Sequence, residues 1–355
     1  MLDAFDVMLY SLVVASIIRD LAIDTTTAGW IASVTLIAAA AGGILFGVVA
    51  DRFGRTRALM ASVLLYSIFT AACGLAQSDR VRGRALGFMQ SAWAVGYALA
   101  ALVVWFVTQY LGFGWRAVFF VGVLPAVFTV WVRRSVDEPA LWHRAKREAP
   151  VPLSTALGGK MLGVTAAVTL MNACCLFAWW GFNSWIPAYL SMPAANGGAG
   201  FSVSLMAGLV FVNQIGMWFG YVTFGFVSDA VGRKRTYITY LVLAALAVWA
   251  YTSTTSVPVL LVLGPITAFL ATGYFSGFGA VTAELYPTSV RATAQGFTYN
   301  VGRVVSAAAP WMVGGFAKTH GFPAAISLAA VSFLVAAACW WFIPETKGRT
   351  ITSTS

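Results

Sequence analysis

Two similar stretches decide the fold, GVVADRFGRTR beginning at Gly47 and GFVSDAVGRKR beginning at Gly225. Their glycines, aspartates and arginines match at an offset of 178 residues (225 − 47). A second pair, RGRALGF from Arg82 and RATAQGF from Arg291, matches at an offset of 209 (291 − 82). The chain is therefore an internal duplication, and between these anchors its first half is shorter by 31 residues (209 − 178).

The composition around these stretches is that of a membrane protein. Of the 355 residues, 60% are hydrophobic and only 10% are charged, whereas a soluble globular protein has about 25% charged residues. These proportions exclude a soluble enzyme, a nucleic-acid-binding protein and a disordered chain. Eleven apolar runs approach the length of a membrane-spanning helix; they are residues 4–18, 29–50, 58–76, 85–111, 117–132, 161–187, 205–227, 237–252, 257–283, 293–317 and 323–343. The sequence therefore predicts an all-α membrane protein.

The net charge of +10 is distributed between these runs. Lysine and arginine gather in six places, which are 52–57, 80–84, 133–160, 233–235, 291 and 347–349. Such clusters mark cytoplasmic loops, and two runs separate most neighbouring clusters, as a common side requires. Only the run 58–76 separates the first two clusters, and one helix cannot return the chain to the side it left. Because 31 residues equal one helix plus a loop, we expect the fourth span of the first half to be missing near residues 78 and 79.

The predicted organisation is two helical bundles, with five spans in the first and six in the second. The segments are an N-terminal bundle at 1–133, a central cytoplasmic loop at 134–158, a C-terminal bundle at 159–344 and a cytoplasmic tail at 345–355. The first run is short, because Asp3 and Asp6 interrupt it and Arg19 and Asp20 end it. It leaves about 12 uninterrupted apolar residues where a span needs about 17. Either this helix lies tilted and partly in water, or the true start is upstream of Met1, and we favour the second.

The repeated pattern Gly-x-x-x-Asp-x-x-Gly-Arg-x-Arg follows the second span of each half and resembles the signature of the major facilitator superfamily of secondary transporters. That resemblance implies two six-helix bundles with substrate bound at their interface. LDAFDVMLYSLV from Leu2, AELYPTSVRATAQGF and the terminal PETKGR further resemble metabolite:proton symporters, nearest to the sialate and lactate (monocarboxylate) branch. That family has an arginine and a glycine-rich stretch in its fourth span, and nothing in this sequence matches them.

Asp3 and Asp6 are the candidate proton carriers. Three residues apart on a helix, their carboxylates share a face. If the helix begins about a dozen residues upstream, that face lies near the membrane midplane, where desolvation and the neighbouring like charge favour a carboxyl that binds and releases protons. The alternative is that Met1 is the real start and both aspartates stand in water.

Arg303 is the candidate ligand for a substrate carboxylate. It lies 12 residues beyond Arg291, hence about 18 Å into the membrane, and its guanidinium fork suits a carboxylate. The alternative is a structural pair with a helix carboxylate or with carbonyl oxygens. The polar and aromatic residues expected to line the substrate cavity with it are Tyr299, Asn300, Gln90, Trp93, Asn172, Trp179, Asn183, Asn213, Gln214 and Tyr274.

Other residues on these runs are predicted from the cost of placing polar groups in lipid. Asn213 and Gln214 are adjacent, so both cannot face lipid cheaply. Trp185 and Tyr189 stand near the end of a span and are predicted to be interfacial anchors.

The repeated motif is predicted to be a gate. Its glycines permit close helix packing, and its aspartates pair with arginines of the same loop or meet a helix N-terminus. In the superfamily this network holds the cytoplasmic side closed, and Glu284 and Arg291 look like partners of Asp229 and Arg233. In the first half the glutamate position is lost with the missing span. The gating residues are Gly47, Asp51, Arg52, Gly54, Arg55, Gly225, Asp229, Gly232, Arg233, Glu284 and Arg291; the alternative is that the charges only set topology.

The resemblance implies proton-coupled uptake of a small organic anion by alternating access. The expected partners are that anion, the proton and the lipid bilayer, for a monomer in the cell inner membrane that binds no nucleic acid. The sequence shows no metal-ligand cluster, nucleotide-binding loop or nucleophile–base pair, so no enzyme activity, metal or cofactor is expected. Because a helix is missing, the alternative is a transport-inactive remnant or a membrane sensor.

Overall fold

The computed structural model describes residues 2–37, 79–121, 158, 161–286 and 291–347, without the side chains of 2–7, 79–90, 119–121, 292 and 293. Every regular element in these ranges is a helix. Five of the described helices are long and apolar enough to cross a membrane, and they are Ser91–Tyr110, Met161–Ser191, Val203–Val231, Val257–Leu285 and Ala294–Cys339. The all-α membrane fold expected from the apolar runs is therefore present.

The first half begins with α1 (Leu2–Leu21) and a shorter apolar helix, Thr25–Ile37. Asp24 starts that shorter helix, because its Oδ1 accepts a hydrogen bond of 2.8 Å from the backbone N–H of Thr27. Later elements of this half are α4 (Asp79–Trp105), the π-helix η1 (Phe106–Tyr110) and α5 (Trp115–Val121).

The second half contains six long helical segments in the described residues. The first three are α9 (Met161–Ser191), α10 (Val203–Val231) and α11 (Arg233–Thr252). The fourth is a continuous series of α12 (Val257–Gly273), η3 (Tyr274–Gly277) and α13 (Phe278–Leu285). The fifth and sixth are formed by α14 (Arg291–Ser306) and α15 (Ala308–Cys339). α15 is bent at Gly321, whose φ of 79° interrupts the helix before Pro323. Its first arm therefore continues α14, and its second arm is a separate span.

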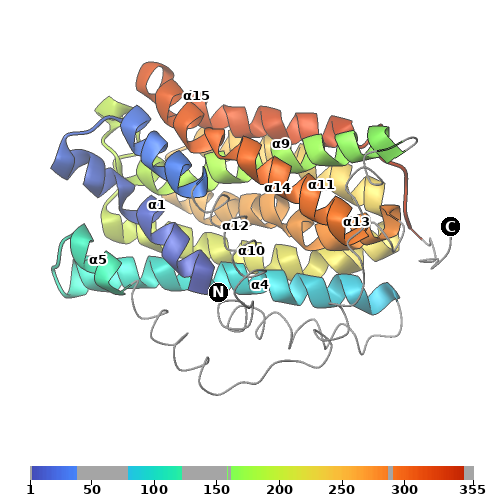
Figure 1. Ribbon diagram of the computed structural model, residues 1–355. Coiled ribbons are helices and arrows are strands. Elements are labelled where there is room, and N and C mark those ends of the chain that lie inside the picture. The colour runs from blue at the N-terminus through green and yellow to red at the C-terminus, as the bar shows by residue number, and fades with distance from the viewer. Residues whose placement is uncertain (1, 38–78, 122–157, 159–160, 287–290, 348–355) are drawn as a thin grey trace, which may run out of the picture.

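The helices lie side by side along one long axis (Figure 1). α10 packs against α4 on one side and α12 on the other, while α9 packs against α14 and α15. The α10–α12 contact is close because Gly216 and Gly220 lie against the backbone of the partner; a Cβ on Gly216 would stand 1.9 Å from the carbonyl oxygen of Pro265. Contact between α4 and α10 joins the first half to the second.

The start of α4 lies at the same end of the bundle as α13, which it contacts (Figure 1). Residues 80–84 are therefore at the end where α11 begins. This arrangement is required if the basic clusters 80–84 and 233–235 lie on the same side of the membrane. We call it the motif end and the other the opposite end.

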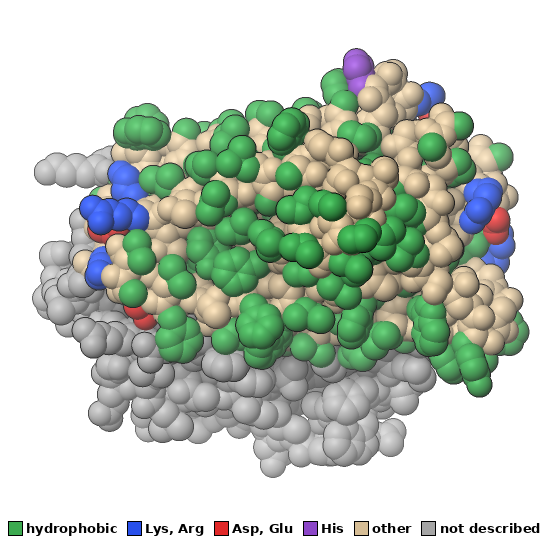
Figure 2. All heavy atoms as spheres, turned by 180° about the vertical axis from the view of Figure 1, so that it is seen from behind, with side chains coloured by type: hydrophobic (Ala, Val, Ile, Leu, Met, Phe, Trp, Pro, Cys, Tyr) green, Lys and Arg blue, Asp and Glu red, His purple; other side chains and the backbone are tan. Residues whose placement is uncertain are grey.

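Charged side chains gather at the two ends of the bundle, and an apolar belt runs between them (Figure 2). Large hydrophobic residues on this belt are strongly exposed, including Trp249 at 63% and Val262 at 61%. Contiguous apolar surface of this kind is not stable in water. It fits a molecule whose middle is surrounded by lipid.

Trp185 and Tyr189 are not interfacial anchors, and that prediction is wrong. Both are only 2% exposed. The indole Nε1 of Trp185 donates to the carbonyl oxygen of Pro310 at 2.9 Å, and the hydroxyl of Tyr189 donates to that of Thr252 at 3.2 Å. Backbone carbonyls inside the bundle thus satisfy the polar tips that were expected to reach the headgroups.

Candidate functional site

The motif of the second half forms a compact charge cluster between α10, α11 and α13. Arg233 is buried, with a side chain 7% exposed, and its guanidinium contacts Asp229 Oδ1 at 2.6 Å and Glu284 Oε1 at 2.9 Å. Its Nε also donates to Glu284 Oε2 at 3.2 Å, and its Nη1 to the Ser228 hydroxyl. One buried cation is therefore held by two carboxylates, the arrangement that offsets the cost of its desolvation.

Glu345, after the end of α15, completes this cluster from the C-terminal segment. Its carboxylate accepts hydrogen bonds from the backbone N–H groups of Arg233 and Lys234, at 2.9 and 3.1 Å, and from those of Thr346 and Lys347. The first two are free N–H groups of the first turn of α11, where a negative charge is favoured. Burial opposes the effect, but the four backbone donors hold the pKa of Glu345 below its ordinary value.

A glycine is required at position 232 by the backbone conformation there and by the neighbouring side chain. Its φ is 113°, in the region that favours glycine, and a Cβ there would stand 2.9 Å from Glu345 Oε2. The motif glycine therefore leaves room for the carboxylate that starts α11. No role for Glu345 was predicted from the sequence, where its place in the terminal PETKGR was the only signal.

Two further predicted gating residues, Gly225 and Arg291, lie on α10 and α14. Gly225 lies in α10 and its carbonyl oxygen accepts the Ser228 hydroxyl at 3.2 Å. Arg291 is the first residue of α14. The motif of the first half lies outside the described residues, namely Gly47, Asp51, Arg52, Gly54 and Arg55.

Arg303 lies on α14 beside a close contact with α9. A Cβ on the preceding Gly302 would stand 3.1 Å from Asn172 Cβ, so the two helices almost touch here. Arg303 is half-buried and has no ion pair with any residue that the structure describes. Asn172 is 3% exposed, and its Oδ1 has no hydrogen-bond partner in the described part of the chain. Gly302, the residue before Arg303, therefore packs against the residue that carries this acceptor.

A group of aromatic rings joins the two halves one to two turns further along α9. Trp179 contacts Trp93 of α4 at 5.5 Å between ring centroids, and Trp180 and Phe275 at 4.7 and 6.2 Å. The indole nitrogens of Trp93 and Trp179 are buried without a hydrogen-bond partner among the described residues. An unpaired buried donor costs about 1–3 kcal/mol, so these two are open to a ligand's oxygen.

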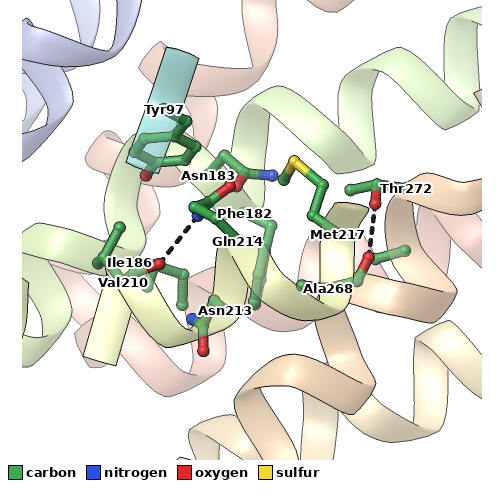
Figure 3. Close-up of a pocket in the computed structure, with 11 residues that line it drawn as sticks. Tyr97, Phe182, Asn183, Ile186, Val210, Asn213, Gln214, Met217, Ala268 and Thr272 are labelled. Atoms are coloured by element: carbon green, nitrogen blue, oxygen red, sulfur yellow. Dashed lines mark hydrogen bonds between the residues drawn. The ribbon is translucent and has the colours of Figure 1, made fainter. Parts of the chain in front are cut away.

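An enclosed cavity lies between α4, α9, α10 and α12 (Figure 3). Its volume of about 10 Å³ is room for about one water molecule. Tyr97, Asn183 and Gln214 line it; the Gln214 amide donates to the carbonyl oxygen of Val210 at 3.0 Å, while its Oε1 is unpaired within the described ranges. Asn213 and Gln214 are 6% and 4% exposed, which agrees with the prediction that both cannot face lipid.

Other predicted site residues fall outside this group. Tyr299 and Asn300 are exposed on α14, and the Asn300 amide donates to the carbonyl oxygen of Gly296 at 2.8 Å. Asp3 and Asp6 lie on α1, but their side chains are outside the described residues, as is that of Gln90 on α4.

The family model of the Major Facilitator Superfamily matches residues 1–81 and 190–354. The chain belongs to the Major Facilitator Superfamily. It is 27% identical to a putative metabolite transport protein of Haemophilus influenzae, across 99% of this chain and 95% of the relative. It is likewise 27% identical to a probable 4-methylmuconolactone transporter of Cupriavidus pinatubonensis, across 99% and 89%. The crystal structure of a D-xylose-proton symporter matches with a TM-score of 0.69 at 19% identity, covering 98% of this chain and 96% of that one.

The two halves of this superfamily member meet tightly at the opposite end. A Cβ on Gly29 would stand 2.4 Å from the carbonyl oxygen of Pro310, and one on Gly314 would stand 2.4 Å from that of Thr25. These reciprocal glycines bring the helix Thr25–Ile37 against the first arm of α15. We call this contact the glycine seam.

Polar contacts border the glycine seam. Lys318 Nζ lies 2.8 Å from Asp24 Oδ2, and the backbone N–H of Trp311 donates to the Ser33 hydroxyl at 3.2 Å. The hydrogen bonds from Lys318 and Thr27 lower the pKa of the Asp24 carboxyl. No sequence pattern predicted this seam, which joins the two halves at the opposite end.

Proposed function

We propose that this superfamily member is a proton-coupled carrier that takes up a small organic anion, with Arg303 binding the carboxylate. The observation that carries this is the half-buried Arg303 guanidinium, which has no carboxylate partner in the described part of the chain. A charge inside a membrane bundle is expensive and is by default functional. Asn172, which packs against the adjacent Gly302, presents an acceptor without a partner among the described residues, and a substrate hydroxyl or amine would fill it.

The names of the relatives support a carboxylic substrate, and most of the acids that they name have a ring. They include a cis,cis-muconate transport protein, a niacin transporter, a gentisate transporter and a sialic acid transporter. The rings around Trp179 offer flat surfaces for such a body. In this proposal the residues that line the substrate path are Asn172, Trp179, Gln214, Gln90, Tyr299 and Asn300.

Asp3 and Asp6 carry the proton in this proposal. α1 begins about half-way along the bundle rather than at either end (Figure 1), which supports a position for both near the membrane midplane. The structural neighbour described as a D-xylose-proton symporter supports symport. The gating motif lies at the cytoplasmic face of the cell inner membrane, and the carrier is a monomer.

The second candidate is a transport-inactive remnant or membrane sensor, favoured by the 31-residue deficit between the two repeats. The alignment to the Haemophilus relative runs over 398 positions, more than the 355 residues of this chain. That relative therefore has residues without a counterpart here. The coding DNA across codons 78 and 79 distinguishes the candidates: an intervening segment of about one helix and loop restores the carrier, and a clean junction favours the remnant.

Uptake into proteoliposomes tests the carrier. We expect an inward proton gradient to drive uptake of at least one of radiolabelled gentisate, nicotinate and sialic acid. Asp6→Asn should remove the gradient dependence, and Arg303→Gln should abolish uptake. Trp249→Phe, on the exposed face of α11, is the matched control and should transport normally. Undiminished uptake by Arg303→Gln would remove it from the mechanism; no uptake of any acid by a folded protein would favour the remnant.

A further inference from the structure

A second, larger cavity lies at the opposite end, away from Arg303. It has a volume of about 210 Å³ and is lined by α1, the end of α4, η1, the turn before α5 and the first residue of α10. Leu12, Val104 and Val203 give it apolar walls, the last of them contributed by the second half. The central cavity has room for one water molecule, whereas this one has room for a small organic molecule.

The mouth of this cavity carries an uncompensated positive charge. Arg19 lines it, is exposed, and has no ion pair with any residue in the described ranges. The adjacent Asp20 is already engaged: the indole Nε1 of Trp115 donates to its Oδ2 at 2.7 Å, and Arg116 Nη1 lies 3.6 Å away. Arg116 in turn stacks on the Trp115 ring at 4.4 Å. The cavity therefore offers one free cation beside a fixed aromatic wall.

The cavity also coincides with a break in regular helix. α4 passes into the five-residue π-helix Phe106–Tyr110, a feature that is uncommon and frequently found at functional sites. Thr108, within it, lines the cavity, and its hydroxyl donates to the carbonyl oxygen of Val104 at 2.7 Å. The widened turn places Thr108 across the cavity from α1.

We propose that this cavity is a capture site for a small monocarboxylate with an apolar body, separate from the site at Arg303. Arg19 binds the carboxylate, and the apolar body lies between the walls of α1, η1 and α10. The choice of an anion with a ring rests on the proposed function; the existence of the site does not. Because Val203 belongs to the second half and Arg19 to the first, a bound anion contacts both.

Protection of an introduced thiol tests the site. The full chain in lipid nanodiscs would carry Thr108→Cys together with Arg303→Gln, and the rate of modification by a charged methanethiosulfonate would be measured with and without benzoate. We expect millimolar benzoate to slow modification at least fivefold, and the neutral benzyl alcohol to have less than half that effect. Tyr110→Cys, whose native side chain is 72% exposed and outside the cavity lining, should show no protection.

Two variants of the arginine separate charge from folding. Arg19→Gln should abolish the protection, and Arg19→Lys, which keeps the charge, should retain most of it. Equal protection by benzyl alcohol, protection that survives Arg19→Gln, or none in the Thr108→Cys parent would each overturn the capture site. Normal uptake by Arg303→Gln with full benzoate protection would instead contradict the proposed function and leave this site standing.

Discussion

The glycine seam predicts how much one methyl group should shift the conformational equilibrium. In Gly314→Ala the new Cβ would stand 2.4 Å from the Thr25 carbonyl oxygen and 2.5 Å from Trp185 Cζ2. Atoms that are not bonded repel one another strongly at such distances, so the two halves must separate here to admit the new methyl group. Overpacking of this kind costs about 1–3 kcal/mol, which corresponds to a change of about 5- to 150-fold in the ratio of closed to open forms.

A cysteine pair across the seam measures that ratio. A Cβ at Gly315 would lie 3.8 Å from both Thr26 Cγ2 and Thr26 Oγ1, within reach of a disulfide. We expect Thr26→Cys/Gly315→Cys to cross-link rapidly under mild oxidation, and the rate to fall at least fivefold when Gly314→Ala is added. Gly163→Ala is the control, because a Cβ there meets nothing within 4 Å.

The result that refutes this reasoning is specific. If Gly314→Ala elutes as a monodisperse folded protein and cross-links at the parental rate, the seam is not a tight contact between the halves. Gly29→Ala provides an independent test on the other helix, where the new Cβ would meet Pro310 O at 2.4 Å. Should either variant fail to fold, the other still decides the question.

Three further predictions concern the ends of the bundle. Glu284→Gln should lower the free energy of unfolding by about 3–5 kcal/mol, because it leaves buried Arg233 with one carboxylate. An unchanged melting temperature would contradict the role of the Arg233–Glu284 pair. Gly232→Ala should cost about 1–3 kcal/mol for its φ of 113°, measured in the same melts, and a neutral effect would be inconsistent with that strain. Lys318 and Thr27 lower the pKa of Asp24, so the contribution of its carboxylate to stability is present above the ordinary carboxyl pKa, near pH 4, and is lost as the pH falls towards the folded-state pKa. The destabilisation caused by Asp24→Asn, measured in the same melts, should therefore be constant from pH 8 to 5 and decline only in stronger acid, and a decline near pH 6 would rule out this role for Asp24.

The spans of the second half could be predicted because their signal is local. α10, for instance, is one apolar run bounded by a serine cap and the charged motif. The burial of Asn213 and Gln214 was also predictable, since two adjacent amides cannot both face lipid cheaply. Predictions of this kind need only composition, length and helical geometry.

The contacts between distant segments could not be predicted in the same way. Glu345 reaches Arg233 across 112 residues of sequence, and no local pattern shows which helix N-terminus a tail carboxylate will meet. The prediction for Trp185 was wrong for the same reason: its position near a span end is typical of an anchor, but Pro310, 125 residues away in sequence, accepts its hydrogen bond. The indole nitrogens of Trp93 and Trp179, which lack a partner in the described part of the chain, depend on the packing of the two halves and have no sequence signature.

The charge cluster of the second half also bears on the missing span of the first. Arg233 is compensated by Glu284, which stands at the end of the fourth membrane segment of that half. If the corresponding segment is missing near residues 78 and 79, the first-half motif lacks the equivalent carboxylate. Removing one partner of a buried pair costs about 3–5 kcal/mol, more than a surface charge could cost. A functional carrier would therefore need a substitute partner for the first-half arginines, either from water or from the second half, whereas a remnant would need none.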